Sequence, residues 1–160
     1  KSIAINSLLQ RRPLSNCVVA FSLSPAKIAK SLDSKAPSIS RRISAIKQLA
    51  AAGWKIGLRF DPLIYTSDWK ELYASLFTDI MDGLDPSMIH SISYGPLRFP
   101  KKMYKKAASL HPEHKLFAFP MEEANGVISY GTKIETQMHD FLKSELNNYI
   151  SENKIFQCIT

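Results

Sequence analysis

Cysteine is nearly absent from this 160-residue chain, which contains only Cys17 and Cys158, separated by almost its whole length. A disulfide scaffold in a small secreted domain uses several cysteines, so this composition argues against that class and favours a reducing, cytoplasmic compartment. Free cysteines are among the most often buried residues in proteins. The simplest interpretation of both residues is therefore a buried thiol.

Long apolar runs are also missing. No stretch approaches the roughly 18 consecutive apolar residues that a membrane span requires, so we expect a soluble protein without membrane contact. Residues 1–9 lack a charged segment followed by a long apolar run, which argues against a secretory signal. The chain begins with Lys1 rather than Met, and we expect this terminus to be a cut. No internal repeat or low-complexity tract indicates a second domain.

Negative charge is in deficit, since 21 Lys and Arg residues outnumber 14 Asp and Glu residues and give a formal net charge of +7. Such a balance favours polyanionic partners, including DNA or another nucleic acid. The clearest phosphate-binding candidate is a lysine cluster on an expected helix over residues 101–110, interleaved with Tyr104. Its members are Lys101, Lys102, Lys105 and Lys106. A solvated lysine face is the commoner reason for such a cluster.

The segment 54–64, WKIGLRFDPLI, alternates in the manner of a strand and places Arg59 and Asp61 on the face opposite Ile56, Leu58 and Phe60. Helical patterns flank it, one ending at Gly53 and one over residues 68–83, so the strand belongs to a parallel sheet. Ligands of such sheets gather at the carboxyl ends of the strands. We therefore expect a site at Arg59 and Asp61, with Pro62 ending the strand. The alternative is a structural ion pair.

Other patterns complete the expected architecture. Strand patterns cover residues 17–24, 88–99, 116–119, 127–130 and 155–159, and helical patterns cover 26–32, 38–53, 101–110 and 132–151. Asp68 and Glu71 suggest a capping box, and Trp69, Tyr73 and Phe77 have the spacing of a helix core rather than of a base-stacking surface. The sequence thus predicts an α/β fold in one domain: strands alternating with helices that make half of a parallel barrel over residues 1–110, with a helical and strand cap over 111–160. The first half of the barrel is expected to be missing.

Several segments, in this order and spacing, resemble the carboxyl-terminal half of the spore photoproduct lyase family of radical S-adenosylmethionine enzymes. They are VVAFSLSP at 18–25, the Pro-Ser helix entry followed by paired arginines, AAAGWKIGLRFDPLI at 50–64, the pair Trp69 and Tyr73, and SYGPLRF at 93–99.

The resemblance implies a partial parallel (β/α)6 TIM-like barrel of about six strands, of which this chain would hold the last three and the terminal cap. The implied activity is that of a C–C lyase that cleaves S-adenosylmethionine to a 5′-deoxyadenosyl radical and repairs a thymine dimer in DNA. It also implies a [4Fe–4S] cluster held by a CxxxCxxC motif. This chain has no such motif, and Cys17 and Cys158 cannot replace it, because clusters are held by closely spaced thiolates. We therefore expect the cluster ligands to lie outside this chain, on an amino-terminal half of the same polypeptide, and we expect this fragment to be inactive alone.

The resemblance also assigns roles to residues. It places Ser22, Ser24, Lys1 and Asp61 at the S-adenosylmethionine site, with Ser22 near the amino-acid end and Lys1 near the carboxylate. It places Arg59, Tyr94 and Arg98 at the substrate.

Structural roles for the same residues remain alternatives to these assignments. The two serines could instead satisfy local backbone groups, and Arg98 could be a solvated exit residue. The rival function is a basic nucleic-acid-binding module without catalysis. His111 and His114 are expected in a solvated loop, and His90 and His139 have no recognisable partners.

Overall fold

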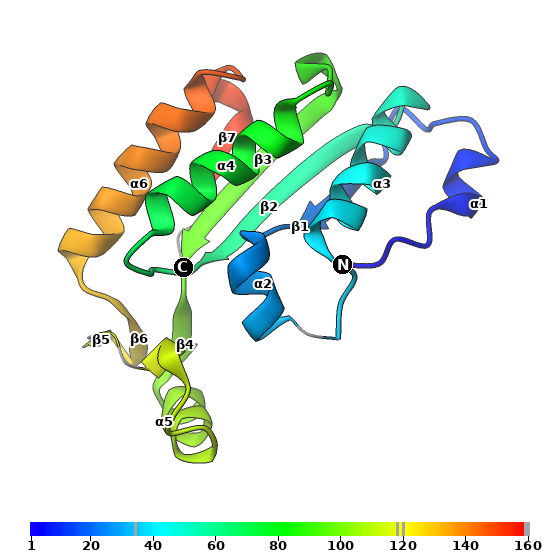
Figure 1. The fold of residues 1–160 in the computed structure, drawn as a ribbon. Helices are drawn as coiled ribbons and strands as arrows, with labels where there is room; N and C mark the ends of the chain where they lie inside the picture. Colours follow the sequence, from blue (N-terminus) through cyan, green and yellow to red (C-terminus); the bar gives the residue numbers. More distant parts are fainter. Residues whose placement is uncertain (34, 118, 120, 159–160) are drawn as a thin grey trace.

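The main sheet consists of four parallel strands in the order β1-β2-β3-β7 (Figure 1). The computed structural model describes residues 1–33, 35–117, 119 and 121–158. The strands of this sheet are β1 (Val18–Ser22), β2 (Lys55–Leu63), β3 (Ile89–Pro96) and β7 (Ile155–Gln157). Because all four run the same way, their carboxyl ends meet at one edge of the sheet.

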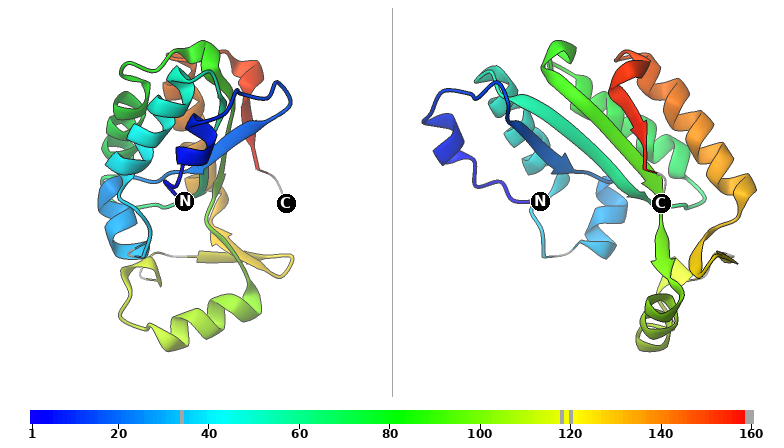
Figure 2. Two further views of the ribbon diagram at one scale, coloured as in Figure 1. Left: turned by 90° about the vertical axis from the view of Figure 1, so that its right-hand side faces the viewer. Right: turned by 180° about the vertical axis from the view of Figure 1, so that it is seen from behind.

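Helices cover only one face of this sheet, as the left view of Figure 2 shows. They are α2 (Ala26–Leu32), α3 (Ile39–Ala51), α4 (Trp69–Met81) and α6 (Thr132–Asn147). The apolar alternation of β2 faces them: Phe60 is fully buried, and its ring packs edge-on against Phe77 at 5.0 Å between centroids. Trp69, Tyr73 and Phe77 are all buried, which confirms them as core residues.

The opposite face of the sheet carries no helix in the described chain (Figure 2, right). Small residues line its centre, where Ala20, Gly57 and Ser91 stand in register on three neighbouring strands. The four-residue helix α1 (Asn6–Leu9), which the sequence did not predict, lies on the β1 side of the sheet. The Leu8 carbonyl accepts a hydrogen bond from Nε1 of Trp54, the residue before β2. One face is therefore packed as a core and the other is open.

Two local expectations about the helices have different outcomes. Helix α3 begins as predicted, with Ser38 Oγ accepting a hydrogen bond from the Arg41 N–H at 3.4 Å, and the turn that follows the helix contains Gly53 at φ +92°. The capping box at Asp68 is wrong. Asp68 makes no side-chain cap and instead accepts a hydrogen bond from Lys27 Nζ at 2.5 Å, because the lysine of α2 competes for the carboxylate.

Pro62 does not end β2, contrary to the sequence expectation, since the strand continues to Leu63. The register with β3 shifts between Phe60 and Leu63, so Asp61 and Pro62 lie in an irregular stretch with both side chains exposed. A proline lacks the N–H of a ladder bond and fits where pairing is interrupted. The bulge therefore keeps the strand intact and leaves Asp61 at its exposed end.

The expected strand over 88–99 is divided in two. Residues 86–88 form a 3-10 turn, β3 follows, and after Leu97 the chain enters a separate antiparallel sheet in the order β4-β6-β5. That sheet is formed by β4 (Arg98–Pro100), β5 (Met121–Ala124) and β6 (Val127–Tyr130). The break falls at Leu97, directly after Pro96 at the end of β3, and Pro100 ends β4. A proline lacks the N–H of a ladder bond, which fits the end of each strand. Together with α5 (Lys101–Leu110), this sheet lies beyond the carboxyl ends of the parallel strands (Figure 1).

The remaining boundaries differ in detail. The predicted strand at 116–119 is wrong where the structure describes it, because 115–117 form a 3-10 turn and the strand is β5 instead; Ala118 lies outside the described residues. A further 3-10 turn covers Glu152–Lys154, and helix α6 ends at Asn147 rather than near Ser151. Strand β7 stops at Gln157, and Ile159 lies outside the described residues. The predicted bounds of α2, α5 and β6 are confirmed.

The structure thus shows a mixed α/β fold built on a four-stranded parallel sheet, as the sequence predicted at this level. Its sheet is open at the β1 edge in the described chain. No helix of the described ranges is both long enough and apolar enough to cross a membrane.

Candidate functional site

A cavity of about 260 Å³ lies at the carboxyl ends of β1 and β2, on the side where strand ends of a parallel sheet bind ligands. Its apolar wall comes from α2, the strand ends and the segments after β3 and α5. These residues are Leu23, Ile28, Leu32, Ile64, Leu97 and Leu116. Polar groups occupy the rest of the lining. The cavity is therefore a mainly apolar pocket with a few convergent polar groups, which is typical of a small-molecule site.

The structure brings all four residues expected at the cofactor into this one cavity. Ser22 closes β1 and Ser24 follows it, and both are half-buried. Asp61 reaches the cavity from the irregular end of β2, and Lys1 comes from the start of the chain. Ser22, Ser24 and Asp61 meet because parallel strands end at the same edge, whereas Lys1 is held there by its ion pair with Asp33.

Arg42 is a cavity residue that sequence reasoning missed. The helical pattern of α3 predicts a surface arginine, but the structure leaves Arg42 only 1% exposed. Its guanidinium donates hydrogen bonds to the carbonyl of Pro37 at 2.9 Å, to the carbonyl of Ser22 at 3.1 Å and to Asp33 Oδ2 at 2.7 Å. The one available signal was the isolated acidic residue Asp33 in a basic stretch.

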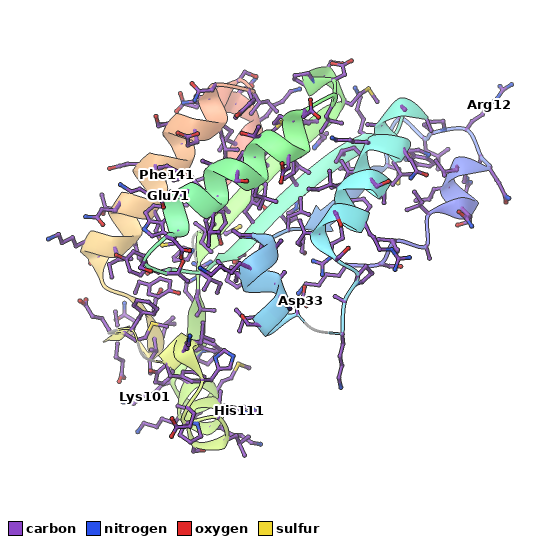
Figure 3. All side chains as sticks on the ribbon, viewed as in Figure 1. Arg12, Asp33, Glu71, Lys101, His111 and Phe141 are labelled. Atoms are coloured by element: carbon purple, nitrogen blue, oxygen red, sulfur yellow. The ribbon has the colours of Figure 1, made fainter. Side chains whose placement is uncertain are left out.

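Asp33 joins Arg42 to Lys1. Its other carboxylate oxygen, Oδ1, accepts a hydrogen bond from Lys1 Nζ at 2.8 Å. Figure 3 labels Asp33 at the end of α2, facing the segment that leads to α3. Burial alone would raise the pKa of Asp33, but the hydrogen bonds and charges of Lys1 and Arg42 outweigh it and hold that pKa below its usual value. The carboxylate is therefore ionised at neutral pH.

Arg59 lies outside this cavity. Its Nη1 donates hydrogen bonds to Ser91 Oγ at 3.1 Å and to the Leu58 carbonyl at 3.3 Å. A Cβ on Gly57 would come within 3.1 Å of Arg59 Nη2, so the guanidinium lies over that glycine on the open face of the sheet. The side chain thus turns back from the carboxyl edge. Among the described residues no ion pair joins Arg59 to Asp61.

Arg98 lines a second cavity, of about 310 Å³, between the end of β3 and the antiparallel sheet. A Cβ on Gly95 would lie 3.1 Å from Arg98 Nη2, so this guanidinium also covers a glycine of β3. Glu122 and Glu135 line the same cavity. Arg98 and Arg59 therefore both lie against glycines of the sheet but at different levels along it.

Tyr94 is on the other face. It is 2% exposed, and its hydroxyl lies 2.7 Å from Nδ1 of His139 on α6, so His139, for which the sequence offers no recognisable partner, has one. Burial raises the pKa of Tyr94 to about 12, with a smaller contribution from the charge of Asp140. The structure therefore separates Tyr94 from the other residues that were expected at the substrate.

The backbone beside the first cavity is held by two tyrosines. Tyr73 Oη accepts a hydrogen bond from the N–H of Ile64, and Tyr130 Oη accepts one from the N–H of Tyr65, each at 3.0 Å. Tyr73 belongs to α4 and Tyr130 to β6, so the antiparallel sheet is connected directly to the loop after β2. The cavity wall at Ile64 is fixed by these contacts.

The residues of the chain do not fit an iron–sulfur cluster. Cys17 precedes β1 at its amino end, whereas Cys158 follows β7 at its carboxyl end, and these two strands are the opposite edges of the sheet. No group of three or more His, Cys, Asp or Glu residues able to hold a metal occurs within the described ranges.

Helix α5 presents the lysine cluster. All four lysines are exposed, as are Met103 and Leu110, at 57% and 63%. Lys101 pairs with Glu123 of β5 at 2.8 Å, and the other side of the helix packs Tyr104 against Phe99 and Phe117. Figure 3 labels Lys101 and His111, near the two ends of this helix, away from the main sheet.

Comparison with known proteins gives a consistent result. A family model described as spore photoproduct lyase matches residues 1–157. No match was found among curated proteins. Solved structures of spore photoproduct lyase share the fold: one complexed with dinucleoside spore photoproduct aligns with a TM-score of 0.77 at 17% identity, and a variant aligns with a TM-score of 0.80 at 18% identity. A third carries bound AdoMet and dinucleoside spore photoproduct, with a TM-score of 0.73 and 17% identity. In each case the match covers 97% of this chain and 48% of the solved chain. The chain therefore spans about half the length of these structures.

Proposed function

The chain belongs to the spore photoproduct lyase family, and on this premise we propose that it forms the carboxyl-terminal part of a radical S-adenosylmethionine lyase that acts on a DNA photolesion. In this proposal the chain supplies contacts to the cofactor and one wall of the substrate chamber. The solved relative with bound AdoMet and dinucleoside spore photoproduct supports both parts.

The open face of the sheet supports a partial barrel. Helices cover one face, and the other displays small residues and the half-buried Arg59. Gly57 and Ser91 are buried with the Arg59 guanidinium against them, but no helix of the described chain covers this face. Parallel sheets are normally covered on both faces, which supports further structure here. We propose that an amino-terminal half supplies further parallel strands, pairs with the β1 edge and encloses this face as the inner wall of a partial (β/α)6 barrel.

The convergence of Lys1, Ser22, Ser24 and Asp61 in one cavity is the observation that carries the cofactor proposal. The lysine ammonium suits the carboxylate of S-adenosylmethionine, the serine hydroxyls suit its amino-acid end, and the Asp61 carboxylate suits a hydroxyl or ammonium donor. When bound and reduced, S-adenosylmethionine supplies a 5′-deoxyadenosyl radical that abstracts hydrogen. The residues of this chain bind and orient that cofactor.

The cluster ligands are assigned to the amino-terminal half, since Cys17 and Cys158 lie at opposite ends of opposite edge strands. The chain by itself is then inactive. Arg59 and Arg98 are proposed to contact the substrate, with both guanidinium groups laid against glycines of β2 and β3. Tyr94 is buried on the helix-covered face, where its hydroxyl meets His139 of α6, so it is no longer proposed as a substrate contact.

The experiment that tests this function is reconstitution of the complete protein with iron and sulfide, followed by reduction in the presence of S-adenosylmethionine. Formation of 5′-deoxyadenosine establishes the radical chemistry. Repair of dinucleoside spore photoproduct then tests the substrate. A protein that assembles no cluster and forms no 5′-deoxyadenosine contradicts the proposal.

A basic nucleic-acid-binding module is the second candidate function, and one observation favours it. Four exposed lysines lie on α5, which lies beyond the carboxyl ends of the parallel strands. Phosphate contacts by lysine give affinity that falls steeply with salt. Salt-dependent DNA binding without any cleavage of S-adenosylmethionine would favour this candidate over the enzyme.

A further inference from the structure

Lys1, Asp33 and Arg42 form an ion network in the lining of the first cavity, with the carboxylate between two cations that differ greatly in solvent exposure. Asp33 accepts hydrogen bonds from Lys1 at 2.8 Å and from Arg42 at 2.7 Å. The side chain of Lys1 is 51% exposed, that of Asp33 is 18% exposed and that of Arg42 is 1% exposed. One partner of the carboxylate is therefore fixed and the other is free to move.

Arg42 cannot leave this position without a large cost. Its guanidinium also donates to the carbonyls of Pro37 and Ser22, and its surroundings exclude water. A buried guanidinium deprived of these acceptors would be an uncompensated charge. The Lys1 ammonium, in contrast, donates to Asp33 from the cavity rim and can rotate into solvent or toward a ligand.

We infer that Asp33 and Arg42 act as positioning residues through a counter-ion exchange at Lys1, and this inference rests on the proposed function. Without ligand, Lys1 is held by Asp33. When a ligand carboxylate enters the cavity, the Lys1 ammonium moves to it, and Arg42 keeps the charge of Asp33 compensated.

Two opposite effects follow from this arrangement. Asp33 competes with the ligand for Lys1, so neutralising Asp33 strengthens binding. Arg42 partly neutralises the Asp33 carboxylate and so weakens its attraction for Lys1. Neutralising Arg42 therefore strengthens the Asp33–Lys1 pair and weakens ligand binding. A purely structural pair would weaken binding in both cases, since either change damages the same wall of the cavity.

The test is isothermal titration calorimetry of S-adenosylmethionine with the complete, cluster-reconstituted protein, without reductant. We expect Asp33→Asn to lower the dissociation constant by about threefold or more, and Arg42→Gln to raise it by about fivefold. In the double variant the Arg42 change should have no further effect, because no carboxylate remains for it to share. Arg41→Gln is the matched control: this neighbouring arginine is exposed, and the change should stay within about twofold.

Asp33→Asn keeps the test decisive if the Arg42 variant does not fold, because the amide has the same shape and still accepts a hydrogen bond from the guanidinium. Unchanged or weaker binding by Asp33→Asn overturns the exchange. Repeating that change in a Lys1→Gln background should abolish its benefit, and a benefit that persists there also overturns it. If the unmodified protein shows no binding at all, the proposed function fails as well, whereas binding that is indifferent to Asp33 removes only this inference.

Discussion

Tyr73 and Tyr130 accept hydrogen bonds from the N–H groups of two consecutive residues, Ile64 and Tyr65, although one tyrosine comes from α4 and the other from the antiparallel sheet. Burial raises the pKa of both phenols, that of Tyr130 to about 12, so both hydroxyls stay neutral over the ordinary range of pH. The loop that leaves β2 is therefore fixed between the two parts of the fold.

We expect Tyr73→Phe to lower the free energy of unfolding by about 1–3 kcal/mol, because the buried N–H of Ile64 would have no acceptor. Urea denaturation measures this difference. Tyr149→Phe is the matched control, since the Tyr149 hydroxyl has only a 3.4 Å contact with Thr78 at the surface, and its effect should be within about 0.5 kcal/mol. Equal destabilisation in the two variants would contradict a special role for Tyr73.

Arg42→Met should destabilise the protein by about 3 kcal/mol or more, because it leaves the Asp33 carboxylate without its buried partner. Arg41→Met, one residue earlier on the exposed side of α3, should change stability by about 0.5 kcal/mol at most. Thermal and urea unfolding of the two variants give the comparison. A loss of stability below about 1 kcal/mol in Arg42→Met would contradict the prediction, because it would show that an apolar side chain of similar size can replace the guanidinium.

Helix bounds were largely predictable from the sequence. The bounds of α2 and α5 follow from prolines that precede the first helical turn and from apolar spacing, both of which are local. The burial of Arg42 had only a weak signal in the sequence, the isolated acidic residue Asp33, because the two residues become neighbours only when α2 and α3 pack. Pro96 was a local signal for the division of the 88–99 pattern, but the pairing of residues 98–100 with β6 could not be predicted, because β6 lies much further along the chain.

The candidate site shows the same limit. Ser22 and Asp61 could be placed together, since they end neighbouring parallel strands and such ends share one edge. Tyr94 could have been assigned to the helix-covered face, because it alternates with Ser93 and Gly95 and shares a face with Ile92. The direction of Arg59 could not be predicted, because strand alternation fixes the face but not whether a long side chain points along the strand or back over Gly57.

The stability of the protein should depend on pH through Asp33. Its pKa is lower in the folded protein than in the unfolded chain, so the stabilisation is fully present above the unfolded value of about 3.9 and disappears as the pH falls through the folded value. Urea unfolding over a pH series should show that Asp33→Asn costs stability at pH 7 and pH 5, and that this cost becomes smaller as the pH falls below about 3.9. A difference independent of pH would show that ionisation is not involved.

Asp61→Ala should reduce the formation of 5′-deoxyadenosine by the complete protein much more than it reduces stability. The Asp61 side chain is exposed at an irregular strand end, so little packing is removed, whereas its carboxylate lines the cavity. Turnover and urea midpoint, measured on the same preparation, separate the two effects. Glu113→Ala, an exposed acidic change outside the cavity, provides the control. Unchanged turnover would remove Asp61 from the site.

Replacing Lys102 and Lys105 by Gln should weaken binding to double-stranded DNA and lower the slope of log affinity against log salt by about 2, because each lysine is expected to neutralise one phosphate. Fluorescence anisotropy over a salt series measures both quantities. Removing the same charge at the exposed residues Lys30 and Lys133 is the control. If both pairs of changes act equally, net charge rather than α5 is responsible.

The pairing of β3 with β7 joins Ile92 to Ile155, so the whole antiparallel sheet, α5 and α6 lie in the chain between two neighbouring strands. Bringing β7 to β3 closes a long loop and costs chain entropy, and the strand that pairs in return has only three residues. During synthesis β1, β2 and β3 can associate with α3 and α4 well before β7 leaves the ribosome. Until then the N–H and C=O groups on this edge of β3 are unpaired, so this edge is a site where a chaperone can prevent wrong strand pairing in the nascent chain.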